Sequence, residues 1–509
     1  MRRGGGVVLV LALWELAALA TSGLYLIAGP SQVAGWIAAH AGLLVRATLV
    51  TTQAAALGFV IGNLAAVALA ALAFLVPRAE RTVASLALVV FCLPLVATGP
   101  ILRVLWGPGT GPQVTLAALA VYYTTFLPLM TGLRAAPESW FDLVQSYGQG
   151  RATELLRVRL RAAVPYLVAG LQIAAPAAIL AAMIGEFTGA ERGLGVLTIR
   201  AMRALDVPGL WAIATVASAL SIAAWWALAE LGRRLAVAPP AVLLSRPATA
   251  PRAPLWQVPL RFILTVALIL ALWQGLMDAF ALNAFFAKRP GDVWHFLTTA
   301  PGAAATLARA WGQTMTLTVP GYLAGLALGM GLAALVAMRP GLGGSVMPVA
   351  IALRSVPILT TAPLIVLALG RGATGTIAIV AVMIFFPTLV ACLSGLRQMP
   401  APVADIFASY AASPWQRLRL AQLPAMLPAL FASARMAVPA AILAATTAEW
   451  LATGIGMGGL MALTASTSAY NMLWSAVAVM AATASLCYVG VERVERAVLA
   501  RYAPEQLRG

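Results

Sequence analysis

Long apolar runs dominate the chain, and short stretches between them hold most of the charged residues. A transmembrane α-helix needs about 20 consecutive, mostly apolar residues, and runs of that length recur along the whole sequence. Helices satisfy their own backbone hydrogen bonds in lipid, whereas the alternating pattern of a membrane β-barrel is absent from this sequence. The pattern predicts an all-α polytopic membrane protein.

The apolar runs predict about twelve spanning helices, six in each half. In the first half they lie near 7–29, 46–75, 82–105, 112–133, 165–188 and 208–232. In the second half they lie near 262–284, 310–337, 345–369, 373–396, 427–450 and 470–490. The first run has features of a signal peptide. A similar run at 264–280 lies in mid-chain, where no signal peptide occurs, so we expect a first membrane helix instead.

The heptapeptide PAAILAA occurs twice, and the two copies lie 439 − 176 = 263 positions apart. With that offset held fixed, many residues other than alanine also coincide, which alanine richness cannot produce. Coinciding pairs include Gly58 with Gly321, Gly62 with Gly325, Pro94 with Pro357, Asp142 with Asp405, Tyr147 with Tyr410, Pro165 with Pro428, Glu186 with Glu449 and Trp211 with Trp474. The sequence therefore predicts two copies of one module, at 1–235 and 259–509, joined by a Pro- and Arg-rich linker at 236–258.

The charge pattern fixes an orientation. The net charge of +17 would suit a nucleic-acid-binding protein, but the excess is nearly all arginine and is dispersed between apolar runs. We therefore exclude nucleic acid as a partner. Arginine in short loops marks the cytoplasmic side, which places both termini and the linker there. Because each half has an even number of predicted helices, the two modules are expected to be parallel.

The sequence offers little enzymatic chemistry. Its three cysteines and two histidines show no metal-ligand or disulfide spacing, so we predict neither a metal site nor a catalytic residue. Lys288 is the only lysine, and a phosphate-binding P-loop needs Gly-Lys-Ser/Thr. We expect no cofactor in this chain. If ATP drives the protein, a partner subunit must bind the ATP and Mg.

The longest polar segments, 136–165 and 401–428, occupy equivalent places in the two halves. Each predicts two short amphipathic helices with a break, at Gly148 in one and at Ala411 in the other. Ser413 and Gln416 predict a capping box at the second helix. A helix–turn–helix with an apolar face is a surface that a partner protein can grip. From the residues alone, a loop lying on the lipid surface is an equal alternative.

These segments resemble the EAA loop of ABC-importer permeases, which docks on the ATPase subunit. Asp142 and Asp405 take the position of the family's Glu, and Gly148 matches its Gly. Neither copy has the alanine pair, and Ala411 replaces the Gly in the second. The resemblance implies ATPase-coupling residues in both segments: Asp142, Ser146, Tyr147, Gly148, Pro165, Asp405, Ser409, Tyr410, Ala411, Pro424 and Pro428.

The wider sequence is similar to the nitrate/sulfonate/taurine branch of these permeases. The similarity rests on Pro30-Ser31-x-Val33, LRSVPILTTAPL at 353–364 and the Glu186–Gly195 run. It implies two fused type I permease modules in a bacterial inner membrane, two ATP-binding subunits and an external substrate-binding protein. The implied cargo is a small solute, such as a sulfonate, nitrate, an aromatic acid or a vitamin precursor.

Candidates for the translocation path come from groups that are costly in lipid. Glu186 and Glu449 end the helices that contain PAAILAA, where a carboxylate serves either an outer gate or a satisfied helix end. Arg354 is interpreted either as an anion-attracting group or as a structural one. Pro94 and Pro357 break regular helix, and broken helices tend to line cavities. Four glycines with small-xxx-small spacing are assigned to helix packing instead: Gly58, Gly62, Gly321 and Gly325.

The main alternative function is an ion-coupled secondary transporter with twelve helices. The stretch between the second and third predicted helices, at 76–82, lacks the Gly-x-x-x-Asp-Arg pattern of such proteins. A scaffold without transport activity is a third class, and it leaves the two matched polar segments unexplained.

Overall fold

The computed structural model describes residues between 11 and 502. Outside the described residues lie 1–10, 13, 17, 22–26, 108, 137, 236–256, 340, 342–361, 363–364, 367–368, 371, 398, 400 and 503–509. The predicted linker therefore falls almost wholly outside the described residues, as do Arg354 and Pro357.

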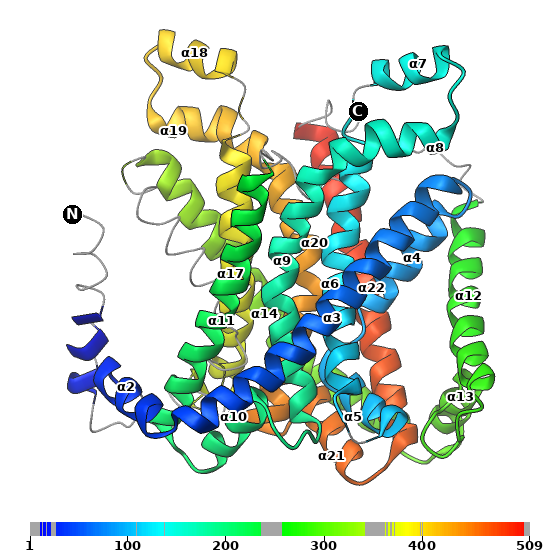
Figure 1. The fold of residues 1–509 in the computed structure, drawn as a ribbon, viewed down its shortest axis with the longest axis vertical. Helices are drawn as coiled ribbons and strands as arrows, with labels where there is room; N and C mark the ends of the chain where they lie inside the picture. The colour runs from blue at the N-terminus through cyan, green and yellow to red at the C-terminus, as the bar shows by residue number, and fades with distance from the viewer. Residues whose placement is uncertain are drawn as a thin grey trace.

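The described chain is helical throughout, and its elements follow in the same order in both halves (Figure 1). The first half contains α2 (Pro30–Ala39), α3 (Ala41–Leu75), α4 (Glu80–Phe91), α5 (Leu95–Trp106), α6 (Gly111–Leu133), α7 (Glu138–Ser146), α8 (Arg151–Glu154), α9 (Leu160–Phe187), α10 (Leu194–Arg203) and α11 (Val207–Arg234). The second half contains α12 (Gln257–Ala279), α13 (Pro290–Thr299), α14 (Ala303–Met338), α17 (Ala373–Leu396), α18 (Ala401–Ser409), α19 (Pro414–Arg417), α20 (Leu423–Ala448), α21 (Gly456–Ser466) and α22 (Tyr470–Tyr502).

Within the described residues, eight helices are long and apolar enough to cross a membrane, or nine if a bent pair is counted as one span. The eight coincide with eight of the predicted runs. The run at 82–105 is not one straight helix, because α4 and α5 meet at an angle of 91°. Pro94 stands at the N-cap of α5, where its ring and missing N–H prevent a continuous helix. Pro100, by contrast, lies inside α5.

The other three predicted spans are described less completely. Helix α12 covers most of the run at 262–284 and ends at Ala279. The runs at 7–29 and 345–369 fall partly or largely outside the described residues. The total of twelve therefore stays a prediction.

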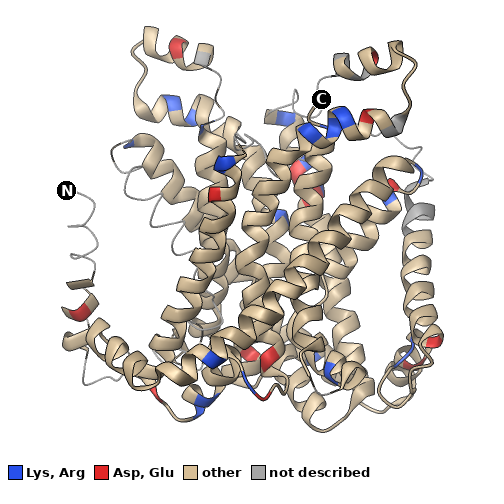
Figure 2. Ribbon diagram, viewed as in Figure 1, with Lys and Arg blue, Asp and Glu red and all other residues tan. Residues whose placement is uncertain are grey.

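The long helices form one bundle with two distinct ends (Figure 1). Helices α7, α8, α18 and α19 protrude from one end, which we call the loop end. Helices α5, α10 and α21 lie at the opposite end, which we call the far end. Charged residues gather toward these two ends, and the middle of the bundle is largely uncharged (Figure 2). This distribution is what a membrane-spanning bundle requires, because a charge at the bilayer centre is costly.

Glycines allow the closest helix crossings in both halves. A Cβ atom on Gly58 or Gly62 of α3 would overlap Ala117 or Val121 of α6. In the second half, a Cβ on Gly325 of α14 would lie 2.7 Å from both the Ala381 carbonyl oxygen and Ile384 Cβ of α17. Gly321 meets Val380 in the same way. The α3–α6 and α14–α17 pairs therefore have the same backbone-to-backbone packing at equivalent sites.

An equivalent pair of tryptophans joins the start of each half to its last long helix, α11 or α22. The rings of Trp14 and Trp211 have centroids 5.4 Å apart, and those of Trp273 and Trp474 are also 5.4 Å apart. Trp211 and Trp474 coincide at the 263-residue offset. The duplication seen in the sequence thus reappears as a duplicated tertiary contact.

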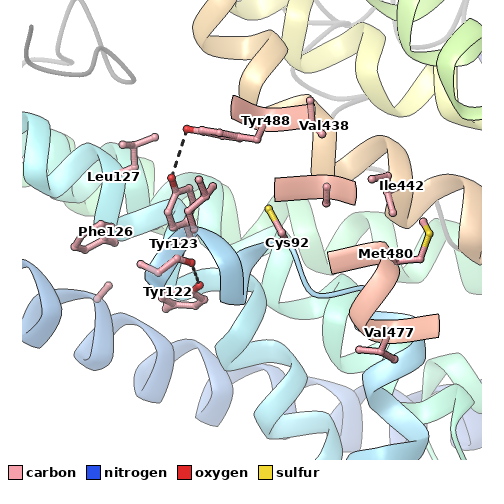
Figure 3. Packing of buried hydrophobic residues seen from close by; sticks show 14 of the residues in the cluster. Cys92, Tyr122, Tyr123, Phe126, Leu127, Val438, Ile442, Val477, Met480 and Tyr488 are labelled. Carbon is pink, nitrogen blue, oxygen red and sulfur yellow. Dashed lines mark hydrogen bonds between the residues drawn. The ribbon is translucent and has the colours of Figure 1, made fainter. Parts of the chain in front are cut away.

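The two halves meet where α20, α21 and α22 of the second half contact α5 of the first, and where α12 and α22 contact α4. Their shared apolar cluster includes Tyr123, Cys92, Val438 and Tyr488. Figure 3 shows Tyr488 directed at Tyr123, and the two hydroxyl groups lie 3.5 Å apart. Tyr488 is fully buried. This interface gives the fused halves one continuous core rather than two separate ones.

Substituting Gly325 with Leu should destabilise the protein strongly, because the contacted Ala381 carbonyl belongs to the backbone and cannot turn aside. We expect a loss of about 2 kcal/mol or more, measured as thermal unfolding of the purified chain in detergent. Gly331→Leu is the matched control, because a Cβ added at Gly331 of the same helix would have nothing within 4 Å. Equal effects of both substitutions would show that the crossing is not tight.

Candidate functional site

The two protrusions at the loop end have the same local structure. Helix α7 ends at Ser146 and helix α18 ends at Ser409. Each serine hydroxyl donates a hydrogen bond of 2.8 Å to the carbonyl three residues earlier, on Leu143 and Ile406 respectively. The chain then reverses direction into α8 or α19. The predicted helix–break–helix is present in both halves.

The break itself is a left-handed C-cap. Gly148 has φ +67° and Ala411 has φ +48°. The Gly148 amide donates to the Gln145 carbonyl and the next amide donates to Val144, which is the Schellman pattern. In the second copy the Ala411 amide donates to the Ala408 carbonyl and the Ala412 amide donates to the Phe407 carbonyl. The left-handed conformation costs an L-residue about 1–2 kcal/mol, so the second copy keeps this turn at an energetic cost that glycine avoids.

The second helix of each protrusion begins differently but continues in the same way. The Ser413 hydroxyl accepts from the Gln416 amide and the Gln416 side chain accepts from the Ser413 amide, which is the predicted capping box. A π-helical turn then joins the protrusion to the long helix, at Leu155–Arg159 before α9 and at Leu418–Gln422 before α20. Each protrusion is therefore continuous with a spanning helix, and a displacement of one moves the other.

The outward surfaces of the protrusions are apolar at matching positions. The exposed fractions are 57% for Leu143 and 56% for Ile406, and 74% for Tyr147 and 83% for Tyr410. Asp142 and Asp405 are exposed beside them. Large apolar side chains that project into water are typical of protein-interaction surfaces. Both protrusions lie away from the bundle (Figure 1), so these side chains have no described neighbour that covers them.

The remaining predicted coupling residues are prolines, and these lie farther from the protrusion tips. Pro165 is inside α9, and Pro428 is inside α20. Pro424 occupies the first turn of α20, directly after the π-helical turn at Leu418–Gln422. They shape the base of the coupling segments rather than their exposed face.

The contacts that hold the base of the first protrusion, which we call its joint, are ionic. Arg159 pairs with Glu154 at 2.5 Å and donates from Nη1 to the Leu133 carbonyl at 2.8 Å. Its guanidinium lies 4.8 Å from the ring centroid of Phe74. These residues border a pocket of about 310 Å³, and Gln145 of α7 lines its outer side. Arg159 thus connects α3, α6 and the coupling segment.

The joint behind the second protrusion is apolar. The positions of Phe74, Glu154 and Arg159 hold Ala337, Arg417 and Gln422 there. Leu418 and Met426 pack with Leu393 and Leu396 in a buried cluster. The equivalent Leu155 and Leu133 also share a buried cluster in the first half, so the second protrusion keeps the apolar contacts without the ion pair. The two protrusions therefore share their exposed surface but differ in how the bundle holds them.

At the far end, the two predicted gate carboxylates make duplicated contacts. Glu186 is 2% exposed, and its Oε1 accepts from the Thr51 hydroxyl at 2.6 Å. Its Oε2 accepts from the Gly195 amide at 2.6 Å. The Thr51 hydroxyl oxygen in turn accepts from the Leu194 amide at 2.9 Å. We call this arrangement, formed by a threonine, a glutamate and two amides of the next helix, the carboxylate clamp.

The second half repeats the clamp with the same separations between the residues along the sequence. Glu449 Oε2 accepts from the Thr314 hydroxyl and from the Gly458 amide, each at 2.9 Å. The Thr314 oxygen accepts from the Met457 amide at 2.8 Å. The amides belong to the N-termini of α10 and α21, where a carboxylate is favourable. Both oxygens of Glu186 are bonded, as in a satisfied helix-end group, whereas Glu449 Oε1 is buried without a hydrogen-bond partner among the described residues. A gate role for either glutamate stays a prediction.

Thr51 and Thr314 were not among the residues predicted from the sequence. They coincide at the 263-residue offset, as their glutamates do. A list of all polar residues repeated at that offset would have included them, without linking them to the glutamates. Pro94, the described member of the two predicted path prolines, lies at the bend before α5, a helix that contacts both α9 and α20. The structure thus brings Pro94 to the junction of the two halves.

These features define a duplicated membrane-spanning helical protein with two equivalent protrusions at one end. The chain belongs to the family of binding-protein-dependent transport system inner membrane components, whose family model matches residues 58–237 and 321–503. The two matches begin 321 − 58 = 263 residues apart, so both modules are members. The chain is an ABC-transporter permease of the type to which the taurine permeases belong.

Individual relatives are one module long. A probable ABC transporter permease protein of Haemophilus influenzae is 28% identical over 42% of this chain and 87% of its own length. The formylaminopyrimidine transport permease protein ThiX of Halalkalibacterium halodurans is 26% identical over 42% and 86%. The taurine transport system permease protein TauC of Escherichia coli is 25% identical over 46% and 86%. Each spans less than half of this chain, as expected if two modules are fused here.

Exchanging the C-cap residues should shift the local stability of the protrusions in opposite directions. Gly148→Ala places a Cβ in a left-handed turn and should make α7 less stable by about 1 kcal/mol, whereas Ala411→Gly should make α18 more stable by a similar amount. Amide hydrogen exchange of residues 138–148 and 401–411 measures both effects. Unchanged protection in both variants would contradict the assigned turn.

Removing the clamp hydroxyl should destabilise the far end. Thr51→Val or Thr314→Val deletes a donor to the buried glutamate and an acceptor for a buried amide, so we expect a loss of about 2 kcal/mol or more in each case. Thermal unfolding in detergent provides the measurement. Thr316→Val is the control, because Thr316 is exposed and its hydroxyl bonds only within its own helix. A control as damaging as Thr314→Val would refute the clamp.

Proposed function

We propose that this chain is the complete membrane-spanning unit of an ATP-driven importer, with one module for each half of the path. Two copies of a cytoplasmic ATPase subunit dock on the two protrusions. An external binding protein delivers the solute to the far end. The proposal rests above all on the pair of matched, exposed apolar surfaces at Leu143, Tyr147, Ile406 and Tyr410.

The location of these surfaces supports docking to a protein in water. The protrusions stand off the end of the bundle, beyond the spanning parts of α9 and α20 (Figure 1). An apolar face that lay on lipid would point back toward the bundle's sides. Both copies also keep the Schellman turn, although alanine in the second copy makes it costly. Maintaining one shape in both halves suits two identical partners.

The orientation of the protein follows from the same assignment. Arginines are concentrated at the loop end, on the segments 78–81, 157–161, 233–234, 417–419 and 493–501. The positive-inside rule makes that end cytoplasmic, which agrees with docking of ATP-binding subunits there. The C-terminal helix α22 ends at the loop end (Figure 1). We place both termini in the cytoplasm of a bacterial cell whose inner membrane holds the protein.

In the proposed mechanism, the helical connection between each protrusion and α9 or α20 transmits movement from the ATPase to the bundle. Each protrusion passes through a π-helical turn directly into α9 or α20. Closure of the ATPase pair would push the protrusions together and tilt these helices, which rocks the modules between inward and outward states. The clamps at Glu186 and Glu449 would carry α10 and α21 along with α9 and α20. No covalent chemistry is needed in this chain, because hydrolysis takes place in the partner.

For the cargo we propose a small organic or inorganic anion or a vitamin precursor. The support is the range of solutes named for the relatives, which include a formylaminopyrimidine permease and a taurine permease. The external binding protein selects among such solutes in our proposal. The permease path then has to admit a class of solute rather than recognise a single one.

The decisive experiment is purification of the tagged chain from its native membrane in mild detergent. We expect an ATPase to co-purify at two copies per chain. Tyr147→Asp combined with Tyr410→Asp should lower its recovery by about 30-fold, because a buried aromatic anchor contributes about 2 kcal/mol or more. The control is Leu205→Asp, since Leu205 is 63% exposed at the far end.

The alternative outcomes are distinct. Equal recovery of the ATPase with all variants would mean that the docking surface lies elsewhere on the chain. No ATPase in any sample, with the chain intact, would favour an ion-coupled secondary transporter. Uptake driven by a proton or sodium gradient in vesicles would then be measured.

A further inference from the structure

Helices α10 and α21 are equivalent in position and in how they are held. Helix α10 follows α9 and helix α21 follows α20, and each packs at the far end of the bundle and begins at a carboxylate clamp. The buried face of α10, formed by Leu194, Leu197 and Ala201, lies against the bundle. The opposite face is therefore free at the far end. The same holds for α21, whose buried face includes Met457 and Met461.

The free faces of these two helices have different chemistry. Arg192 precedes α10, and Arg200 and Arg203 lie one turn apart on it, all three exposed. The equivalent positions in the second half hold Ile455, Leu463 and Ser466. Ile455 is 48% exposed and Leu463 is 60% exposed. One scaffold thus presents a basic surface in the first half and an apolar surface in the second.

The arginines of α10 have no stabilising partner among the described residues. None of them takes part in an ion pair there, and Glu191 is the one acidic neighbour in the preceding turn. Arginine at the outer end of short membrane loops also opposes the positive-inside rule. Arg200 and Arg203 lie in the last turn of α10, where a cation is favourable, but Arg192 precedes the helix, and three exposed arginines that oppose the preferred topology point to an external ligand.

The asymmetry between the halves identifies the kind of ligand. Lipid headgroups surround both halves alike, so they would not favour arginine at one equivalent position and leucine at the other. A free anion would likewise gain nothing from Ile455 and Leu463. A two-lobed protein placed across both helices meets each of them with a different surface, and complementary charge then fixes its orientation.

Resting on the proposed function, we propose that α10 and α21 form a polarised docking platform for the external binding protein. The lobe with the more acidic surface sits on Arg192, Arg200 and Arg203 of the first half. The less charged lobe sits on Ile455 and Leu463 of the second half. The platform turns a pseudo-twofold receptor into one that accepts its partner in a single orientation.

The first test uses a photo-crosslinking amino acid, benzoylphenylalanine, in cells that carry the whole transport system. It is placed at Ala204 or at Thr467, which are exposed equivalents next to the two surfaces. Mass spectrometry identifies the crosslinked peptide. We expect position 204 to capture the acidic lobe of the binding protein and position 467 to capture the other lobe. Capture of one lobe by both positions, or of lipid alone at 204, would overturn the proposal.

The second test exchanges the two surfaces. The variant carries Arg192→Ile, Arg200→Leu and Arg203→Ser together with Ile455→Arg, Leu463→Arg and Ser466→Arg. Because all six positions are exposed or follow an exposed turn, the fold should survive. The crosslinking preferences of positions 204 and 467 should then reverse. Unchanged preferences would show that these side chains do not set the orientation.

A salt series adds a functional readout. Arg200→Leu with Arg203→Ser should slow binding-protein-dependent uptake about tenfold at low ionic strength, since electrostatic steering raises association rates by tenfold or more. The defect should shrink at high salt, where the Debye length falls to about 3 Å. Lys288→Gln, at the same end but away from α10, is the control.

The outcomes separate this inference from the proposed function. ATPase co-purification and basal ATP hydrolysis should be unchanged in every α10 and α21 variant. If the protrusion variants still release the ATPase while the crosslinks fail to distinguish the lobes, only the docking platform is wrong. If no ATPase and no binding protein associate with the chain, the importer assignment fails with it.

Discussion

A carboxylate buried in an apolar bundle must be hydrogen-bonded, because an unpaired charge there costs several kcal/mol. Glu186 and Glu449 each bond to a threonine hydroxyl and to an amide in the first turn of the following helix, Glu186 through both oxygens and Glu449 through Oε2 alone. The bond partners come from α3 or α14, so each clamp joins three segments of its module. These bonds set the orientation of α10 relative to α9 and of α21 relative to α20.

The clamps also explain why the two halves keep the same residues at these positions. At the clamps, a change in any one residue leaves a buried donor or acceptor without a partner. The glycine crossings of α3 with α6 and of α14 with α17 are constrained in a similar way, because backbone atoms occupy the space of a side chain. Both features are repeated between the halves. The exposed faces of α10 and α21 lie under no such constraint and differ completely in charge.

In a fused chain each module has its own stretch of sequence, so the two halves can differ from each other. Arg435 is buried on α20 and pairs with Glu495 of α22 at 3.0 Å. The equivalent positions in the first half hold Gln172 and Gly232, so α9 and α11 pack there without an ion pair. The reverse holds at the loop end, where the ionic joint around Arg159 belongs to the first half. A homodimer of single modules could not divide its ionic contacts in this way.

Local pattern and repetition were enough to predict the helical membrane class, the duplication and the places of the two helix–break–helix protrusions. The length of apolar runs, a fixed 263-residue offset and helix-capping signals are properties of neighbouring residues or of repeated ones, so they can be recognised without any tertiary contact. The break at Ala411 and the capping box at Ser413 were predictable for that reason.

Contacts between distant residues account for what the sequence did not reveal. The 91° bend between α4 and α5, the partners of Glu186 and Glu449, and the burial of Arg435 all depend on packing between separate segments. Thr51 lies 135 positions from Glu186, and no local pattern joins them. The free faces of α10 and α21 became visible once packing had fixed which sides are buried. Distance along the chain hides such contacts, and folding brings them together.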